Sequence, residues 1–340
     1  MMMNKGKLKA AILGYGRSGS SLHADAIEKS AEFELSAVCD IDEKAGEAAH
    51  KRFGCRVYED YRDMLDKEEL DIVVIVTRSS QHCLMACDCL EAKKNVLVTK
   101  PWALDCAQAK KMIDAAAQSG KRLLPWLPAR WGADLLRLRE LIESKIIGEI
   151  FQVRRSEFSF SVRSDWQTLK EYGGGYLLNW GPHLIDQPIL LLGQQVKSVY
   201  AEMKHLINLG DAEDMFYAVM KTREGAIIVS EYNLCADKLP GWVIQGDRGT
   251  IFSKGGEIEI HRAVMPQNAD KGSYGSAVKM EVTTEKVIGD RYGDADRIYA
   301  HIACALHGGD YGVSTGSALE LTRVLDAIRQ SNDTGQVVFL

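Results

Sequence analysis

The sequence lacks a strong excess of charge of either sign. Its 42 lysines and arginines stand against 47 aspartates and glutamates, which gives a formal net charge of -5. A chain so close to neutral creates no field that would gather nucleic acid or anionic lipid. We therefore expect no nucleic-acid partner and no membrane partner, and a small molecule becomes the natural ligand.

A long apolar run near the start of the chain is also missing. Lys5, Lys7 and Lys9 precede an apolar stretch, but this stretch ends at Gly14 after only a few residues. It is too short for the apolar core of a signal peptide or for a membrane span. We expect a cytoplasmic protein.

The cysteines do not form a disulfide framework. The eight of them are scattered over positions 39, 55, 83, 87, 89, 106, 235 and 304. Cys83, Cys87 and Cys89 lie near His82, but on a helix Cys89 points about 200° away from Cys87. No second pair of ligands follows at a spacing that suits a metal. We expect no metal site and reduced thiols that pack as small apolar side chains.

What is present is a regular alternation in the first third of the chain. At 340 residues the chain is long enough for two domains. Strands are expected at 8–13, 34–39, 56–58, 71–76, 95–98 and 121–124, and helices at 18–29, 43–53, 60–67, 80–92 and 104–119. This pattern predicts a doubly wound, mostly parallel sheet of the Rossmann type. Pro125 and Pro128 then break the alternation, which predicts one domain over 1–125 and a second over 126–340.

The remainder has the pattern of hairpins. Strand-like alternation is found at 150–162, 198–203, 215–222, 226–234, 242–246, 251–253 and 257–261, with helices near 132–146 and 317–331. Turn residues separate the strands, as in Arg223-Glu224-Gly225 and Gly246-Asp247-Arg248-Gly249. The second domain is therefore predicted to be α+β, with a large, mostly antiparallel sheet and helices on one face.

The most informative motif lies in the first domain. An apolar strand runs into Gly14-x-Gly16-x-x-Gly19, a helix follows, and Asp40 ends the next strand. In such a motif the first glycine makes the tight turn, the second admits a pyrophosphate, and the third lets helix and strand pack closely. The helix start supplies N–H groups to the phosphate. The motif predicts a dinucleotide site.

Asp40 bears on which dinucleotide is bound. Its carboxylate would accept hydrogen bonds from the ribose hydroxyls, and its charge would repel a 2′-phosphate. This favours NAD, with NADP as the less favoured cofactor. An alternative is that Asp40 caps a turn with Asp42, and the two interpretations are compatible.

A candidate for proton transfer stands at a strand end. Lys100 follows the apolar segment 96–98 and precedes Pro101. Ligands of doubly wound sheets bind at the carboxyl ends of the strands. A lysine held there beside a cationic nicotinamide would be driven toward its neutral, proton-accepting form. A surface lysine at a turn is the alternative.

A second candidate follows a run of glycines. Gly173, Gly174 and Gly175 would allow a ligand close to the backbone, and Asn179 and His183 stand at i and i+4 on one face of the helix that follows. Histidine can exchange a proton near neutral pH. The alternative is a buried histidine bonded to a backbone carbonyl.

Together these motifs resemble the Gfo/Idh/MocA oxidoreductases. The resemblance rests on the glycine motif with His23 at its end, Thr77, a Glu-Lys-Pro-like element at Thr99-Lys100-Pro101, Arg130-Trp131, and the glycine run followed by His183 and Asp186. It implies NAD- or NADP-dependent chemistry on sugars, inositols or similar polyols. It also implies that Lys100 and His183 share the proton transfer, and that the chain assembles into homodimers or homotetramers through the open face of the carboxyl-terminal sheet.

Two positions depart from the family pattern. Thr99 stands where the family has glutamate, and Asn179 stands where it has aspartate. An amide can hold a substrate hydroxyl but cannot accept its proton. Asp186 remains available as a partner of His183. The missing carboxylate motivates a rival hypothesis, in which the protein is a non-catalytic NAD-binding sensor. A third possibility is an enzyme with tightly held cofactor.

The expected site can therefore be stated residue by residue. The candidate catalytic residues are Lys100, His183 and Asn179. The candidate cofactor-binding residues are Gly14, Tyr15, Gly16, Arg17, Ser18, Gly19, Asp40, Thr77, His82 and Lys100. The candidate substrate-binding residues are Lys100, Trp102, Arg130, Asn179, Trp180 and His183, in which flat rings suit the faces of sugars and arginine suits hydroxyl or carboxylate groups.

Overall fold

A computed structural model describes residues 6–236, 239–265, 274–275 and 278–340. The chain divides into two compact units. The first comprises the residues up to Pro128 together with 169–174 and 294–323, and the second comprises 129–168, 175–293 and 324–340. The chain first leaves the first unit close to the boundary expected at residue 125. Two later segments, 169–174 and 294–323, belong to the first unit again, so a single boundary does not describe the two units.

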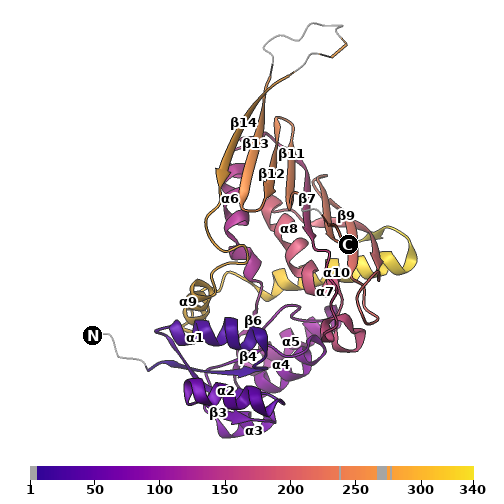
Figure 1. Ribbon diagram of the computed structural model, residues 1–340. Helices are drawn as coiled ribbons and strands as arrows, with labels where there is room; N and C mark the ends of the chain where they lie inside the picture. The colour runs from indigo at the N-terminus through magenta and orange to yellow at the C-terminus, as the bar shows by residue number, and fades with distance from the viewer. Residues whose placement is uncertain (1–5, 237–238, 266–273, 276–277) are drawn as a thin grey trace. The chain divides into compact units, whose positions relative to one another are not determined.

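The first unit is built on a six-stranded parallel sheet (Figure 1). Its strands lie in the order β3-β2-β1-β4-β5-β6, and all neighbouring strands run parallel. Their bounds are Leu8–Leu13 for β1, Phe33–Cys39 for β2, Arg56–Tyr58 for β3, Ile72–Ile75 for β4, Asn95–Val98 for β5 and Leu123–Pro125 for β6. The strand order reverses at β1, where a doubly wound sheet opens a crevice at its carboxyl edge. The predicted Rossmann architecture is confirmed.

The helices of this unit begin and end at the residues that helix termini prefer. They are α1 (Asp25–Lys29), α2 (Glu43–Phe53), α3 (Tyr61–Lys67), α4 (His82–Glu91), α5 (Cys106–Ser119) and α9 (Ala295–Leu306). Asp42, Asp60 and Asp105 accept backbone N–H groups at three helix starts. Gly54 and Gly120 end α2 and α5 in the left-handed conformation. Helix α9, which the sequence analysis did not predict, places Tyr299 edge-on against Phe33 at 5.6 Å.

The second unit contains a nine-stranded sheet in the order β14-β13-β12-β11-β7-β10-β9-β8-β15. Its strands are β7 (Ile150–Phe158), β8 (Val196–Lys204), β9 (Met215–Thr222), β10 (Ile227–Asn233), β11 (Trp242–Gly246), β12 (Gly249–Lys254), β13 (Glu257–Val264), β14 (Lys279–Lys286) and β15 (Val338–Phe339). Only β7 and β10 pair in parallel, so the mostly antiparallel sheet is confirmed. Gly246 and Gly249 pair with each other and close the β11–β12 hairpin, as the turn residues predicted.

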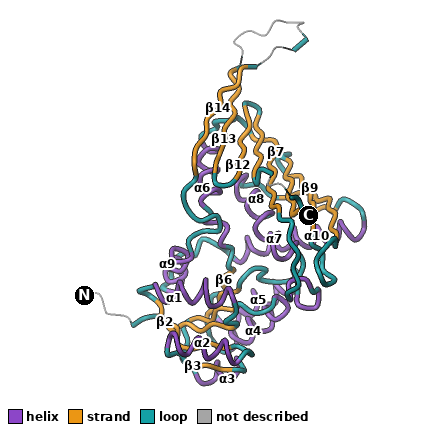
Figure 2. Tube along the Cα trace, in the orientation of Figure 1, coloured by secondary structure: helices purple, strands orange, loops and turns teal. Residues whose placement is uncertain are grey.

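Helices cover one face of this sheet (Figure 2). They are α6 (Ala133–Glu143), α7 (Tyr176–Leu184), α8 (Asp186–Leu192) and the second half of α10 (Thr315–Thr334). Alternate strand residues point into a core with them, as in β9, where every second side chain is buried. The members of one buried cluster are Leu135, Leu138, Leu141, Ile147, Val153, Leu191, Trp242, Ile244, Ile251, Ile258 and Ile260. The other face of the sheet carries the remaining alternate residues.

Three further properties concern the cysteines, metal binding and membrane-spanning helices. All eight cysteines are free, and burial raises the pKa of Cys87 to about 11. Over the described ranges, no group of three or more histidine, cysteine, aspartate or glutamate side chains is arranged to hold a metal ion. Among the helices built from those residues, none is both long enough and apolar enough to cross a membrane.

Candidate functional site

The glycine motif forms a tight turn between β1 and the first helix. Gly14 has a φ of +90°, and a Cβ there would come within 2.8 Å of the Val76 carbonyl oxygen. A Cβ on Gly19 would lie 2.0 Å from the Gly14 carbonyl oxygen, so strand and helix approach closely at this point. A Cβ on Gly16 would meet no protein atom within 4 Å. The turn therefore has open space at the one glycine that the motif assigns to a pyrophosphate.

The helix after this turn begins as a π-helix. Residues Gly19–Ala24 form the π-helical segment, and α1 continues from it, where the sequence predicted one helix over 18–29. Ser21 Oγ donates to the Arg17 carbonyl oxygen at 2.7 Å. His23 is fully buried in this segment, and its Nδ1 lies 3.0 Å from the Tyr299 hydroxyl. Burial lowers the pKa of His23 to about 3, so the ring is neutral near pH 7.

Asp40 ties the glycine turn to the end of β2. Its Oδ2 accepts the Tyr15 backbone N–H at 2.6 Å, and its Oδ1 accepts the Asp42 backbone N–H at 2.9 Å. The cap with Asp42 that the sequence allowed is therefore present. A carboxylate offers about four lone-pair sites, so two of them remain for ribose hydroxyls. The contact with Tyr15 was not expected, and it holds the carboxylate beside the turn.

His82 does not face solvent at the carboxyl edge. Its side chain is 1% exposed, Nδ1 lies 2.8 Å from the Pro101 carbonyl oxygen, and Nε2 lies 3.1 Å from the Thr77 carbonyl oxygen. Both ring nitrogens therefore contact the protein backbone, which leaves no polar atom of His82 for the cofactor that the sequence assigned to it. Thr77, at the end of β4, directs its hydroxyl toward Met85 Sδ at 3.5 Å.

Lys100 lies two residues after the end of β5, close to the strand end where the sequence predicted it, and is half-buried. Thr99, the residue before Lys100, is held in place because its backbone N–H and its hydroxyl both donate to the Ile75 carbonyl oxygen, at 3.1 and 2.8 Å. The threonine that replaces the family glutamate thus bonds the ends of β4 and β5 together. The peptide bond between Lys100 and Pro101 is cis.

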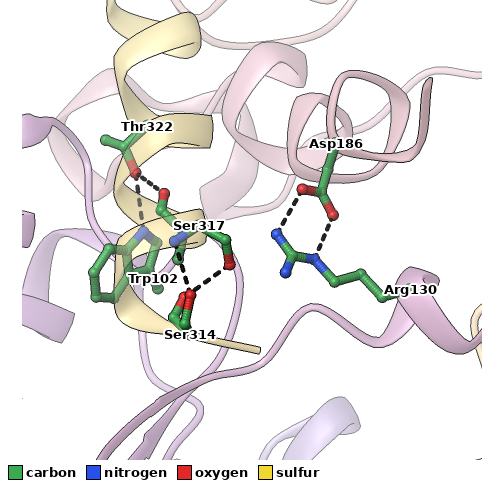
Figure 3. Close-up of polar contacts among 7 residues, drawn as sticks. Trp102, Arg130, Asp186, Ser314, Ser317 and Thr322 are labelled. Carbon is green, nitrogen blue, oxygen red and sulfur yellow. Dashed lines mark hydrogen bonds and ion pairs between the residues drawn. The ribbon is translucent and has the colours of Figure 1, made fainter. Parts of the chain in front are cut away.

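Trp102, a predicted substrate contact, lies in the core of the first unit. The side chain is 2% exposed, and its Nε1–H donates to Thr322 Oγ1 at 2.9 Å (Figure 3). Thr322 in turn donates to the Ala318 carbonyl oxygen within α10. The indole therefore anchors α10, whose first turn is closed by Ser314 and Ser317. With so little exposed surface the ring cannot stack on a sugar, and we treat Trp102 as a packing residue.

The glycine run 173–175 spans the point where the chain passes from the first unit to the second. A Cβ on Gly173, at φ +70°, would lie 2.9 Å from Ser79 Cβ, and a Cβ on Gly175, at φ +106°, would lie 2.3 Å from Glu213 Oε1. Glu213 also accepts the Leu177 backbone N–H at the start of α7. Protein packing and backbone conformation therefore explain both glycines, in place of the close ligand approach that the sequence suggested.

In the second unit, α7 carries Asn179, Trp180 and His183. Asn179 and His183 are one helical turn apart, as expected, and His183 is 5% exposed. The His183 ring lies 5.2 Å from the ring of Tyr292, and Trp180 stacks on Tyr232 at 5.5 Å. Burial raises the pKa of Tyr292 to about 12. Sequence reasoning missed both tyrosines, because their segments are joined to α7 only by the fold.

Arg130 and Asp186 form a buried ion pair in the same unit (Figure 3). Arg130 Nε and Nη2 donate to the two carboxylate oxygens of Asp186, each at 2.8 Å, and the side chains are 9% and 5% exposed. Burial raises the pKa of Asp186, and the Arg130 guanidinium opposes that rise. Each candidate thus has the other as its partner, where the sequence assigned Arg130 to substrate and Asp186 to His183.

Each unit therefore holds one part of the predicted site. Residues from the ends of β1, β2, β4 and β5 lie along the carboxyl edge of the first sheet, and these include Gly14, Asp40, Thr77 and Lys100. Asn179, Trp180 and His183 share one helix of the second unit. That Lys100 and His183 act on one substrate stays a prediction.

Comparison with known proteins identifies the two units. Residues 8–125 match the oxidoreductase family with an NAD-binding Rossmann fold, and residues 135–252 match the Gfo/Idh/MocA C-terminal domain. The chain is 22% identical over 346 residues to scyllo-inositol 2-dehydrogenase (NADP(+)) of Bacillus subtilis, covering 98% of this chain and 96% of that protein. It is 32% identical over 207 residues to D-glucoside 3-dehydrogenase of Escherichia coli, covering 58% of each.

A solved structure extends the likeness to the whole fold. The WlbA dehydrogenase of Chromobacterium violaceum, in complex with NADH and UDP-GlcNAcA, is 27% identical with a TM-score of 0.85, covering 99% of this chain and 97% of that one. The glycine turn at the carboxyl edge of a parallel sheet, followed by the mostly antiparallel second unit, agrees with both family models. The chain therefore belongs to the Gfo/Idh/MocA family of oxidoreductases, and its first unit is a nicotinamide-dinucleotide-binding Rossmann domain.

Proposed function

We propose that this protein is an NAD-dependent oxidoreductase that interconverts a secondary alcohol and the matching ketone of a sugar, an inositol or a related polyol. The observation that carries the proposal is the carboxyl edge of the first sheet, where the glycine turn, Asp40 and Lys100 follow β1, β2 and β5. Overall, the alcohol loses a hydride and a proton, and NAD⁺ becomes NADH.

The residues of this edge fit a dinucleotide. The open space beside Gly16 admits a pyrophosphate to the backbone, and the start of a helix directs backbone N–H groups toward an anion. Asp40 keeps acceptor sites for the ribose hydroxyls. Its negative charge disfavours the 2′-phosphate of NADP, so we propose NAD although one relative is named for NADP(+). When bound, the nicotinamide supplies the hydride acceptor.

Lys100 and His183 carry the proton transfer in this proposal. Lys100 accepts the proton of the substrate hydroxyl, assisted by His183, and Asn179 donates a hydrogen bond that orients the same hydroxyl. Because an amide cannot take up a proton, Asn179 only orients the substrate, and Lys100 and His183 transfer the proton. Correct alignment of the reacting groups accounts for a large part of the barrier reduction.

The carbohydrate class follows from two kinds of support. The relatives are named for inositol and glucoside dehydrogenation, and the WlbA complex holds a nucleotide sugar. In this chain Trp180 and Tyr292 bring flat rings beside His183, and such rings pack well on the C–H faces of sugars. Trp102 and Arg130 are not part of the proposed substrate site.

We also propose that the protein is a homodimer or homotetramer that assembles through the helix-free face of the nine-stranded sheet. Phe339 on β15 and Val282 on β14 are 73% and 53% exposed. Their strand partners alternate with buried residues, so both side chains point away from the helices. Exposed apolar side chains on a broad sheet suit an interface between copies. Light scattering of the purified protein measures the assembly.

The decisive experiment replaces Lys100. Purified protein is mixed with NAD and a panel of sugars, inositols and polyols, and formation of NADH is followed by its absorbance at about 340 nm. We expect turnover with at least one member of the panel, and a loss of about 100-fold or more in Lys100→Met, because general base catalysis contributes that much. NAD binding, measured by calorimetry, should persist.

Lys94→Met is the matched control. Lys94 precedes the amino end of the same strand, β5, where its Nζ donates to the Glu68 carbonyl oxygen, so its turnover should equal that of the wild type. Undiminished turnover in Lys100→Met contradicts the role of Lys100. Binding of NAD and sugar without turnover across the panel would instead favour the non-catalytic sensor.

A further inference from the structure

His82 occupies an unusual place for a buried histidine. It is the first residue of α4, and it follows the short 3₁₀ turn Ser79–Gln81. The ring is 1% exposed, and burial lowers its pKa. The backbone carbonyls of Thr77 and Pro101 flank the ring, so it bridges the segments that leave β4 and β5.

These two segments are the ones that the proposed chemistry depends on. Pro101 comes directly after Lys100, and Thr77 is a predicted cofactor contact. Strands β4 and β5 pair side by side up to Ile75 and Val98. Beyond these residues no ladder bond can involve the Pro101 nitrogen, because proline has no N–H. The His82 ring therefore connects Pro101, which has no N–H of its own, to the segment that follows β4.

Thr99 and His82 attach the lysine on its two sides. On the amino side, the backbone and hydroxyl of Thr99 donate to the Ile75 carbonyl oxygen. On the carboxyl side, His82 Nδ1 lies 2.8 Å from the Pro101 carbonyl oxygen. A neutral imidazole carries one N–H and donates to one carbonyl at a time, whereas the imidazolium donates to both. We assign the single proton of the neutral ring to Nδ1, because its contact, with the Pro101 carbonyl oxygen, is the shorter of the two.

We infer that His82 is a positioning residue for Lys100: it holds the Pro101 carbonyl and thereby fixes the backbone that carries the lysine. The inference rests on the proposed function, since it gives His82 a task in the proton transfer assigned to Lys100. It differs from a cofactor contact, because the ring is buried and both of its nitrogens face backbone carbonyl oxygens. Small displacements of a reacting group lower the rate far more than they lower binding.

Three substitutions separate the contributions of the two contacts. His82→Phe keeps a ring but removes both nitrogens. His82→Asn places an amide near the position of Nδ1 and retains a donor for Pro101, and His82→Gln places one near Nε2 and retains a donor for Thr77. We expect kcat to fall by about 100-fold in His82→Phe and His82→Gln. His82→Asn should recover most of it, and the Kd for NAD should stay near the wild-type value in all three.

His50→Phe is the matched control. His50 Nδ1 also contacts a backbone carbonyl, that of Cys55, at 2.8 Å at the end of α2. The same ring change and the same kind of lost bond occur there without any link to Lys100. Its kcat should equal that of the wild type. If His82→Phe does not fold, the comparison of His82→Asn with His82→Gln carries the test alone.

Crystal structures of the variants make the outcome independent of turnover. In His82→Phe the segment 99–101 should move relative to β4, and in His82→Asn it should return to the wild-type position. Wild-type kcat in His82→Phe, equal kcat in His82→Asn and His82→Gln, or an unmoved segment in His82→Phe overturns the inference. A wild type without turnover overturns the proposed function, and the crystallographic comparison still decides whether His82 holds the segment.

Discussion

Burial of His23 predicts that the protein loses stability in mild acid. The ring is fully buried, its Nδ1 contacts the Tyr299 hydroxyl, and its centroid lies 4.7 Å from that of Trp126. Burial lowers its pKa to about 3, from 6.5 for an exposed histidine. Between these two values the unfolded chain binds a proton that the folded chain refuses. Stability is therefore complete above the unfolded pKa, and it falls as the pH drops toward 3.

The size of the effect follows from the two pKa values. Near pH 7.5 an unfolded histidine is almost wholly neutral, and its protonation lowers the free energy of unfolding by only about 0.1 kcal/mol. Near pH 5 protonation of the unfolded histidine raises the equilibrium constant for unfolding by a factor of about 30. This lowers the free energy of unfolding by about 2 kcal/mol. Such a loss is a large fraction of the stability of a typical domain. His82 is buried in the same way with a lowered pKa, so the wild type should lose more than His23 alone accounts for.

Urea unfolding of wild type and His23→Phe at both pH values isolates the contribution of His23. His23→Phe removes the titrating ring and keeps an aromatic side chain beside Trp126. Its absolute stability should fall at neutral pH because the Tyr299 bond is lost. Its further loss between about pH 7.5 and about pH 5 should be smaller than that of the wild type by about 2 kcal/mol. Equal losses in the two proteins would refute the reasoning, whatever their absolute stabilities.

Two other predictions concern the glycine turn and its acidic neighbour. Asp40→Asn keeps an acceptor oxygen and removes the charge, so the ratio of kcat/KM for NAD to that for NADP should fall by about 10-fold, which corresponds to 1.4 kcal/mol; an unchanged ratio would mean that the charge at position 40 does not select the cofactor. Gly16→Ala should weaken NAD binding in calorimetry without altering the free energy of unfolding, because a Cβ there meets no protein atom. Gly19→Ala should destabilise the first unit by about 1–3 kcal/mol in urea unfolding, because its Cβ would lie 2.0 Å from the Gly14 carbonyl oxygen. Equal stabilities of the two alanine variants would contradict this division of roles.

The sequence predicted most strands because hydrophobic alternation and buried apolar runs mark them directly. The bounds of β9 and β11 agree with the prediction residue for residue. Strand β14 was missed because nearly all of its side chains are exposed, so no alternation reveals it. Strand β15 has two residues and no pattern of its own. Helix α9 was missed although its signal exists, since Asp294 caps it and its apolar residues follow a helical period.

Side-chain partners were harder to predict than elements. Trp102 and Thr322 are 220 positions apart, and Arg130 and Asp186 are 56 apart. The local sequence around one residue of either pair does not predict its partner. Trp102 and Arg130, which the sequence assigned to the substrate, are bonded to Thr322 and Asp186. Asp40, in contrast, was placed correctly beside the turn, because a motif of fixed spacing determines where its strand ends.

The structural reason for a glycine differs from one position of the fold to another. Gly14, Gly19 and Gly175 all stand where a side chain would collide with protein atoms, and two of the three have positive φ values. Packing and backbone conformation are sufficient reasons for glycine at these positions. At Gly16 neither reason applies, since the space beside its Cα is open and its φ is not in the left-handed region. We propose that glycine at this position keeps the backbone accessible to the pyrophosphate of the dinucleotide, as the second glycine of a Rossmann turn does.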